Sequence, residues 1–267
     1  MKAAQKTIRL GTHGEQYGNW MPVSMLVMVG GLLALAGAFA ALCFAAFRLN
    51  VPGVLFTLTT LALAAVFCWI AWIRRQFAFG GGGVMERVHQ AILSHLDFDG
   101  KGQILDVGCG SGALSIRAAL VWPQARVLGI DAWPPAYNYS QRMCEKNAES
   151  EGVAVRCRFQ RGDANKLDFP GEYFDAVVSN YVYHNITGAD RQALLLETLR
   201  TLKKGGVFAL NDEMKPRMYG DMEAFAQKLR AMGYEEVRLV DTAREIFGHR
   251  WAALMMLGAS RLLVGRK

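Results

Sequence analysis

Cysteine is scarce in this chain. The 267 residues contain five cysteines, an odd number, and no pair of them has the C-x-x-C spacing. An odd count without that spacing argues against both a disulfide framework and a zinc site. We therefore expect no metal centre, and we expect the soluble part of the chain to work in a reducing cytosol.

Charge is missing from two long stretches near the beginning of the chain. No charged residue occurs between Val23 and Phe47, or between Leu49 and Ile73. Each stretch reaches the roughly 20 residues that cross a bilayer, which predicts a transmembrane helical hairpin over residues 23–73. A cleaved signal peptide would be shorter and would lack the second stretch. A hairpin buried in a soluble core is the remaining alternative, and it would have to be apolar on every side of both helices.

Cations flank both stretches and predict the orientation of the hairpin. Three lie before the first stretch, Arg48 lies in the short turn, and Arg74 with Arg75 follows the second. Because cytoplasmic flanks carry the excess of lysine and arginine, both termini and the soluble domain should be cytoplasmic at the cell membrane. The three N-terminal cations are Lys2, Lys6 and Arg9.

The formal charge of +7, from 30 basic and 23 acidic residues, would permit an anionic partner. The basic residues are scattered, however, and only Arg156, Arg158 and Arg161 cluster in the soluble part. Alternate positions of this kind are typical of one solvated face of a strand. We expect membrane lipid around residues 23–73 as a partner, and no nucleic acid.

The composition divides the chain into four segments. Residues 1–22 form a polar cytoplasmic tail in which we expect little fixed structure, and residues 23–73 form the hairpin. Residues 74–83 end in four consecutive glycines and predict a flexible joint. Residues 84–267 have the length and the alternation of apolar segments of one α/β domain.

A short apolar run at residues 103–107 leads directly into closely spaced glycines and then into helix-forming residues. This order predicts a strand, a tight turn and a helix. Gly108, Gly110 and Gly112 would let the backbone turn sharply and let a ligand approach closely. Such a turn at the carboxyl end of a parallel strand is where open α/β sheets bind nucleosides.

Two classes of cofactor fit this turn. Gly108, Gly110 and Ala113 match the dinucleotide fingerprint, and Asp131 lies about where that fingerprint places its ribose-binding acid. Asp106, two residues before the first glycine, favours the other class. A carboxylate at the mouth of the loop would repel a diphosphate and attract a ligand with ammonium and sulfonium charges.

Asp106-x-Gly108-x-Gly110-x-Gly112 resembles the first motif of class I S-adenosylmethionine-dependent methyltransferases, of the small-molecule, type 11-like kind. The resemblance implies that Asp131 bonds the ribose hydroxyls and that Asp163 contacts the adenine amino group. Trp133 would either line the adenine pocket or pack under the turn that follows it. The full set of implied cofactor contacts is Asp106, Gly108, Cys109, Gly110, Gly112, Asp131, Ala132, Trp133, Asp163, Ala164, Asn180 and Tyr181.

The rest of the domain follows the order of that family. Apolar runs predict six further strands, at residues 125–130, 153–159, 174–180, 207–211, 236–240 and 260–264. With helices between them, the resemblance implies a Rossmann-like, seven-stranded, mostly parallel sheet with helices on both faces. It also implies that the last two strands pair antiparallel at the sheet edge.

The resemblance implies a direct attack by the acceptor on a sulfonium methyl group, which chiefly requires alignment. If the acceptor must lose a proton, His184 and Tyr183 are the candidates, since they follow the strand that ends at Asn180. A histidine held there only for structure is the alternative. Cys109 is expected to fill the turn rather than act as a nucleophile. The N-P-P-Y signature of base and glutamine methylases is absent.

The sequence therefore predicts a membrane-anchored methyltransferase that uses S-adenosylmethionine and acts on a small or lipophilic acceptor. Two alternatives stay open at this point. One is a nicotinamide-dependent oxidoreductase built on the same sheet, and the other is a non-catalytic membrane protein that binds a nucleoside.

Overall fold

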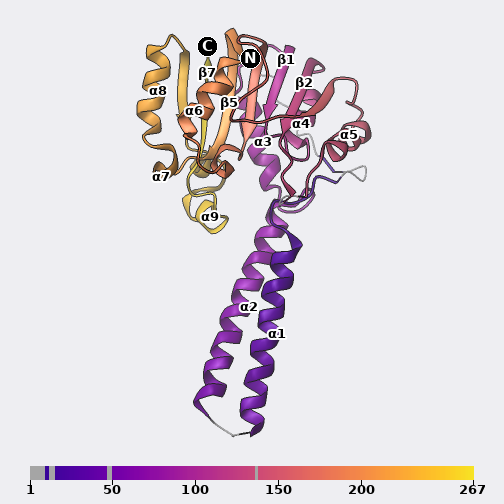
Figure 1. Ribbon diagram of the computed structural model, residues 1–267, viewed down its shortest axis with the longest axis vertical. Helices are drawn as coiled ribbons and strands as arrows, with labels where there is room; N and C mark the ends of the chain where they lie inside the picture. Colours follow the sequence, from indigo (N-terminus) through magenta and orange to yellow (C-terminus); the bar gives the residue numbers. More distant parts are fainter. Residues whose placement is uncertain (1–9, 12–15, 47–49, 136–137) are drawn as a thin grey trace. The chain divides into compact units, whose positions relative to one another are not determined.

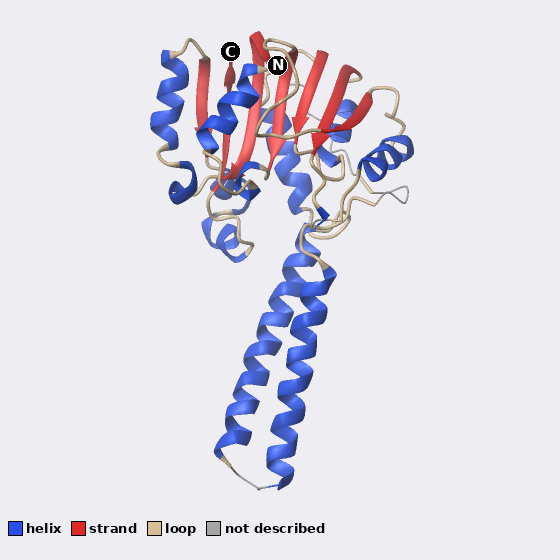
Figure 2. Cartoon of the chain, in the orientation of Figure 1, coloured by secondary structure: helices blue, strands red, loops and turns tan. Residues whose placement is uncertain are grey.

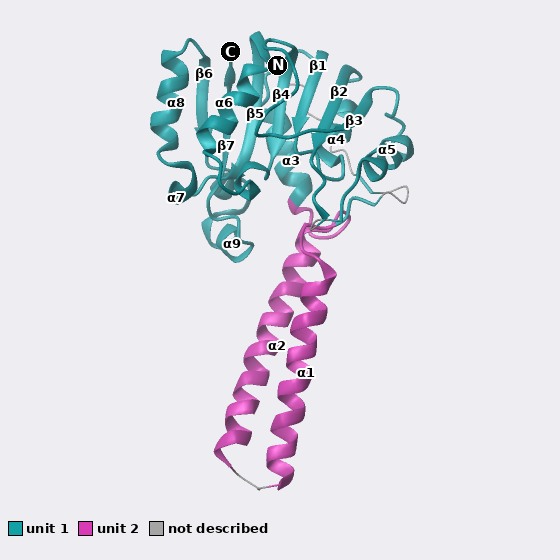
Figure 3. Ribbon diagram, viewed as in Figure 1, with its two compact units in different colours: residues 1–18, 85–267 teal, residues 19–84 magenta. Residues whose placement is uncertain are grey.

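The computed structural model describes residues 10–11, 16–46, 50–135 and 138–267, which fall into two compact units. One unit comprises Met1–Gly18 and Met85–Lys267, and we call it the sheet unit; the other, the hairpin unit, comprises Asn19–Val84 (Figure 3). Lys2, Lys6, Arg9 and Arg48, which supported the predicted orientation, lie outside the described residues.

The hairpin unit consists of α1 (Val23–Ala46) and α2 (Val51–Phe77), which run side by side (Figure 1). Phe39 stacks on Phe56 with ring centroids 5.4 Å apart. Both helices are long and apolar enough to cross a membrane, and only 17% and 6% of their most apolar windows are buried. A core helix of a soluble protein would be mostly buried, so the exposed apolar surface is what the predicted hairpin requires.

The second helix ends later than the sequence predicted. It continues past Ile73 to Phe77, and the amide of Gly82 then donates to the carbonyl of Arg75 at 3.0 Å. A side chain at Gly81 would place its Cβ 2.2 Å from that same carbonyl oxygen. The glycine run, predicted as a flexible joint, therefore begins as a hydrogen-bonded turn that only glycine can make so closely.

The sheet unit contains the predicted seven-stranded sheet, whose strands are red in Figure 2. The strands lie in the order β3-β2-β1-β4-β5-β7-β6 (Figure 3). The first five strands in chain order are parallel, and β7 is antiparallel to both β5 and β6. The strands are β1 (Lys101–Val107), β2 (Gln124–Asp131), β3 (Cys157–Arg161), β4 (Phe174–Asn180), β5 (Leu202–Glu213), β6 (Glu235–Val240) and β7 (Ser260–Arg266). The predicted fold class and the antiparallel edge are confirmed.

Helices cover both faces of this sheet. From β1 the chain passes through α4 to β2, toward the β3 edge of the sheet. From β4 it passes through α6 to β5, toward the β6 edge. Because crossovers between parallel strands are right-handed, these two helices lie on opposite faces. The helices of the unit are α3 (Val84–His95), α4 (Ala113–Val121), α5 (Gln141–Ser150), α6 (Arg191–Arg200), α7 (Pro216–Tyr219), α8 (Met222–Ala231) and α9 (His249–Leu254).

The alternation of side chains along β1 positions the site. Leu105 and Val107 are fully buried in the core cluster that α6 and α8 complete. Successive strand residues point to opposite faces, so Ile104 and Asp106 point toward the face that carries α4. This alternation places an acidic side chain beneath the turn at the end of β1.

Several boundaries differ from the prediction. Strand β3 begins at Cys157 rather than at Val153, and β5 begins at Leu202 rather than at Val207. Helix α5 begins at Gln141, after the N-cap Ser140. The segment that contains α9 was not predicted.

The described part of the N-terminal tail is ordered against the sheet unit, contrary to our expectation. Leu10 and Tyr17 are buried. The Tyr17 hydroxyl donates to Glu151 at 3.0 Å, and the amide of Gln16 donates to Asn147 at 3.1 Å. The described residues of the tail therefore pack on α5.

Candidate active site

The glycine turn joins β1 to α4 and is tied to the next strand. The amides of Gly108 and Cys109 both donate to the carbonyl of Ile130, at 2.8 and 3.0 Å. Gly108, Gly110 and Gly112 have φ values of 72°, 56° and 82°, which disfavour any residue with a Cβ. The turn is thus a fixed loop at the carboxyl end of the parallel strands, as predicted.

Asp106 lies under this loop and not at its mouth, where we had expected it. Its side chain is 1% exposed, and one oxygen accepts a hydrogen bond of 2.5 Å from the hydroxyl of Ser115 on α4. Burial raises the pKa of Asp106 to about 7, and the charge of Asp131 adds to the rise. No cationic side chain among the described residues forms an ion pair with this carboxylate, and a cationic ligand could supply that charge.

Replacing Asp106 with asparagine should stabilise the ligand-free protein at neutral and alkaline pH. The pKa of this carboxyl is about 7 in the folded protein and 3.8 without burial, so the folded state holds a proton between these values. Its contribution to stability falls as the pH rises through that window, by up to about 4 kcal/mol. Thermal unfolding should show the gain of the variant over wild type growing between about pH 4 and pH 7.

Asp163→Asn is the matched control for that series. Asp163 is exposed, and hydrogen bonds from Asn165 lower its pKa, so its own titration falls below the same window. Its stability difference from wild type should stay flat. A flat series for Asp106→Asn as well would contradict the buried, protonating carboxyl.

Asp131 ends β2 and faces the glycine loop. Its two oxygens accept from the amides of Gly110, at 2.9 Å, and Trp133, at 2.6 Å. The indole of Trp133 donates to the carbonyl of Gly110 at 2.8 Å, so this ring lies against the loop. Each carboxylate oxygen has a further lone pair, which leaves Asp131 able to accept two hydroxyls. Ala132, which lies between Asp131 and Trp133 in the sequence, is exposed.

The remaining cofactor candidates lie on the same edge of the sheet. Gly162, directly after β3, donates to the carbonyl of Asp131 at 3.0 Å, which brings Asp163 and Ala164 beside β2. Cys109 is buried, and burial raises the pKa of its thiol well above the usual value. A protonated buried thiol suits the role of turn filler.

The end of β4 carries the residues expected near the reacting atoms. The side chain of Asn180 accepts from Asn211 on β5 at 2.9 Å. Tyr181 has a φ of 55°, and its hydroxyl lies 2.9 Å from that of Ser260 at the start of β7. Burial raises the pKa of the Tyr181 hydroxyl, which disfavours the phenolate. Tyr181 is therefore fixed as a neutral group.

His184 is oriented by a carboxylate that the sequence reasoning missed. Its Nδ1 is hydrogen-bonded to Asp212, and its backbone amide donates to the other oxygen of that carboxylate at 3.2 Å. The Asp212 side chain is completely buried, whereas 27% of the His184 side chain is exposed. If Nδ1 carries the proton for Asp212, Nε2 is left as an acceptor on the exposed side of the ring.

Tyr183 takes a different place from its neighbour. Its side chain is fully buried in the core cluster, and its hydroxyl lies 3.0 Å from that of Thr198 on α6. Burial also raises its pKa above the ordinary tyrosine value. The structure therefore separates the two candidate catalytic residues, with Tyr183 in the core and His184 at the surface of the site.

A second acidic residue follows Asp212. Glu213 is 6% exposed, and burial raises its pKa, while the charge of Lys215 and the backbone of Ala259 act in the opposite direction. The Nζ atom of Lys215 lies 3.9 Å from Oε2 of Glu213. The end of β5 therefore presents buried acidic groups beside His184, and these could accept a hydrogen bond from a bound molecule.

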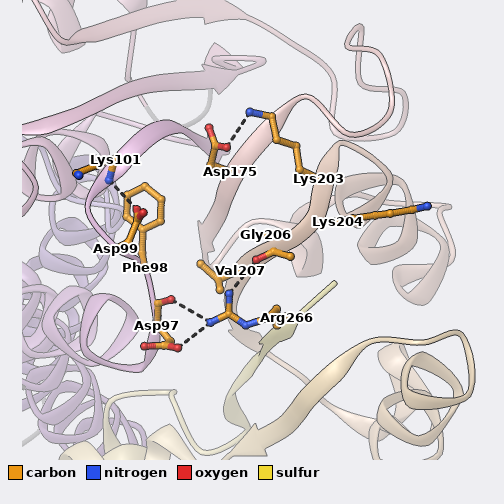
Figure 4. Close-up of a pocket in the computed structure, with 11 residues that line it drawn as sticks. Asp97, Phe98, Asp99, Lys101, Asp175, Lys203, Lys204, Gly206, Val207 and Arg266 are labelled. Carbon is orange, nitrogen blue, oxygen red and sulfur yellow. Dashed lines mark hydrogen bonds and ion pairs between the residues drawn. The ribbon is translucent and has the colours of Figure 1, made fainter.

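A pocket of about 400 Å³ lies at the opposite end of the sheet (Figure 4). It is lined by the starts of β1, β4 and β5, and ion pairs cross it from Lys203 to Asp175 and from Arg266 to Asp97, each at 2.7 Å. These residues lie at the end of the sheet opposite to the end that carries the glycine loop and His184. The pocket is therefore separate from the candidate site.

Comparison with known proteins agrees with this geometry. Residues 104–206, from β1 to the start of β5, match the family model of a methyltransferase domain. Residues 104–206 therefore form a methyltransferase domain of the S-adenosylmethionine-dependent kind. The match includes the glycine loop, Asp131, Asp163 and the end of β4, which are the positions on which the resemblance in the sequence depended.

Two curated relatives are methyltransferases. An uncharacterised methyltransferase of Synechocystis is 29% identical over 148 residues, which are 55% of this chain and 64% of that protein. The demethylmenaquinone methyltransferase of Symbiobacterium thermophilum is 30% identical over 135 residues, which are 50% of this chain and 51% of that protein. The chain thus spans between half and two thirds of the length of these relatives.

Among solved structures, a geranyl diphosphate C-methyltransferase of Streptomyces coelicolor has the same fold, with a TM-score of 0.52 and 17% identity. The match covers 68% of this chain and 79% of that one. That structure contains S-adenosylhomocysteine, Mg²⁺ and geranyl diphosphate. At this identity the likeness concerns the fold.

The residues of the methyltransferase domain fit the cofactor of the family. The loop glycines leave no Cβ between the backbone and a ligand, and a Cβ on Gly108 would lie 2.2 Å from Val182. Below the loop, Asp106 is a buried acid that forms no ion pair within the part of the chain that the structure describes, and Asp131 lies close enough to raise its pKa. Two acids suit a cationic ligand and would repel a diphosphate.

Sequence reasoning missed two residues of the site. Ser115 holds the Asp106 carboxylate, and Asp212 orients His184. Asp212 had one signal, because it directly follows the apolar run 207–211 in the strand that neighbours β4. Parallel strands end at one edge, so an acid there should have been placed beside the residues after Asn180.

Proposed function

We propose that this protein is a membrane-anchored enzyme that transfers a methyl group from S-adenosylmethionine to a small, lipophilic acceptor, with His184 as the general base. The observation that carries the proposal is the position of two groups at neighbouring strand ends. The acidic glycine loop ends β1, and the His184–Asp212 pair bridges the ends of β4 and β5.

The cofactor side would be held by the residues already described. When bound, S-adenosylmethionine supplies an electrophilic methyl group on a positively charged sulfur. Asp131 would accept the ribose hydroxyls, and Asp163 would accept from the adenine amino group. The glycine loop admits the ligand to backbone distance, and Asp106 supplies negative charge beneath it.

On the acceptor side, His184 would take the proton that the nucleophile loses. Its Nε2 is the free ring nitrogen when Nδ1–H donates to Asp212. The buried carboxylate fixes the ring orientation and stabilises the imidazolium that forms. The buried carboxylate of Glu213, which is ion-paired with Lys215 at 3.9 Å, would accept a hydrogen bond from the same acceptor.

The acceptor class rests on two observations. The curated relative from Symbiobacterium is named for demethylmenaquinone, a small molecule. The hairpin helices expose apolar side chains over most of their length, including Leu35 and Leu61, which are 59% and 63% exposed. A tether in the bilayer raises the encounter rate with substrates dissolved there, which favours a lipophilic acceptor.

Transfer is tested with membranes that contain the full-length protein, radiolabelled methyl donor and a total lipid extract. Label should enter the organic phase with wild type and not with Asp131→Ala. Label only in water-soluble products would overturn the lipophilic acceptor and leave methyl transfer standing. No acceptor-dependent label in either phase, from protein that binds the donor, would favour the non-catalytic nucleoside-binding alternative.

Arginine in the middle of both hairpin helices should release the protein from membranes. Leu35→Arg and Leu61→Arg together should cost about 6 kcal/mol of insertion free energy, since one central arginine costs about 3. Alkaline carbonate washing should leave wild type in the pellet and extract the double variant. Val155, which is 92% exposed on the sheet unit, provides the control Val155→Arg. Wild type in the supernatant would contradict the anchor.

The orientation has its own test. Arg74 and Arg75 follow the apolar part of α2 in the last turn of the helix, and the positive-inside rule then places both termini in the cytoplasm. A fluorescent-protein fusion at Lys267 should fluoresce in bacterial cells, and an alkaline phosphatase fusion at the same residue should be inactive. The reverse pair of results would invert the proposed topology.

A further inference from the structure

Helix α9 exposes a cluster of large apolar side chains. Trp251, Leu254 and Met256 are 58%, 49% and 51% exposed, although they lie within six residues of one another. Ala252 and Met255, from the same turns, are buried. The segment is therefore two-sided, with one side packed on the sheet unit and the other apolar and exposed.

This cluster lies at the end of the sheet that carries the candidate site. Helix α9 precedes β7, which runs antiparallel to β5, so the start of β7 is at the carboxyl end of the parallel strands. Ser260, the first residue of β7, is 2.9 Å from the hydroxyl of Tyr181. Figure 1 shows α9 projecting from this end of the sheet. The acceptor side and the apolar cluster thus share one edge.

The segment before α9 packs against the helix through which the chain enters the sheet unit. The guanidinium of Arg87, in the first turn of α3, lies 5.2 Å from the centre of the Phe247 ring. His95, at the other end of α3, is 3.0 Å from Glu245. The segment that precedes α9 is therefore held along α3, within the sheet unit.

The charges around the cluster are mostly positive. Arg244 and Arg250 are exposed within the same segment, and Arg217 is exposed just after β5. The nearby acid Glu245 is engaged by His95. Tryptophan and aliphatic side chains beside cationic ones are typical of elements that lie in the interface of an anionic bilayer.

We propose that α9 and Met256 insert into the surface of the membrane in which the hairpin is anchored, so that the edge with His184 faces lipid. This inference rests on the proposed membrane anchor. The bilayer is the occupant favoured here because the same chain carries two helices able to span it. The basic residues match anionic headgroups.

Spin labels on the full-length chain test the proposal in nanodiscs of phosphatidylcholine with a minor fraction of phosphatidylglycerol. Cys43 and Cys68, the cysteines that are not buried, are first replaced by serine. Single labels are then placed through Leu254→Cys and Met256→Cys. Collision with dissolved oxygen reports lipid, and collision with an aqueous nickel chelate reports water.

Two further label sites make the outcomes distinct. Met232→Cys is the matched control, because Met232 is 55% exposed and precedes β6 at the opposite end of the sheet. Leu61→Cys reports whether α2 itself is in lipid. We expect the labels at 254 and 256 to lose contact with the chelate and gain contact with oxygen, as at 61, while the label at 232 stays aqueous.

The contrary results separate the two proposals. Aqueous labels at 254 and 256 with a lipid-exposed label at 61 would overturn insertion of α9 and leave the anchor standing. An aqueous label at 61 as well would overturn both. Labels at 254 and 256 shielded from both relaxants would show that protein covers the cluster, a second copy or another partner, and would also overturn the proposal.

Discussion

Replacing His184 with glutamine should lower the rate constant of methyl transfer by about a thousandfold, within the range for loss of a general base. Glutamine can still hydrogen-bond to Asp212 and cannot take a proton. Affinity for S-adenosylhomocysteine should stay within a factor of about two, because no cofactor contact is removed. Single-turnover transfer and equilibrium binding measure these two quantities separately.

Asp212→Asn and Tyr183→Phe make this prediction specific. The amide that Asp212→Asn introduces can donate to Nδ1 and thereby favour the wrong tautomer, so this variant should lower the rate by a similar factor. Removing the Tyr183 hydroxyl should cost about 1 kcal/mol of stability and leave the rate unchanged, since that group bonds Thr198 in the core. An unchanged rate in His184→Gln would show that the acceptor reacts without a base.

Gly108→Ala should weaken cofactor binding by at least about a hundredfold, which corresponds to roughly 3 kcal/mol. The new Cβ would lie 2.2 Å from Val182, and the residue has a φ of 72°. The loop must therefore move from the position in which it admits a ligand. Calorimetric titration with S-adenosylhomocysteine measures the loss, and circular dichroism checks that the fold survives.

Two companion variants separate collision from backbone strain. Gly188 has a φ of 76°, and a Cβ added there would meet no atom within 4 Å, so Gly188→Ala should cost only about 1 kcal/mol of stability and leave binding intact. Adding Val182→Ala to Gly108→Ala should recover part of the affinity by removing the methyl groups nearest the new Cβ. Equal losses of binding in Gly108→Ala and Gly188→Ala would contradict the close-approach argument.

The sequence predicts those parts of the fold in which neighbouring residues alone determine the local structure. The apolar run ending at Asp106 and the glycines after it specify a strand and a turn by themselves, and the structure has both. The beginning of β5 could not be read in this way. In the sequence, Gly205 and Gly206 signal the end of a helix. In the structure they lie in a strand, because the amide of Gly205 donates to the carbonyl of Lys267 and the amide of Lys267 donates to the carbonyl of Gly206.

The same distinction holds for the site. Asp106 was found from its spacing to the glycines. Its burial depends on the alternation of side chains along β1 and on Ser115 of α4, so its position under the loop, rather than at the mouth of the loop, was not predicted. Asp212 became visible as a partner of His184 only once β5 was paired with β4. Sequence spacing identifies groups on one turn, whereas pairs from different strands require the register of the sheet.

The most direct test of the account is equilibrium binding of S-adenosylhomocysteine, NAD and NADP to the full-length protein in detergent, by isothermal titration calorimetry. We predict one site for S-adenosylhomocysteine, loss of binding in Asp131→Ala, and no heat from either dinucleotide. Binding of NAD or NADP at the glycine loop without binding of S-adenosylhomocysteine would contradict the account.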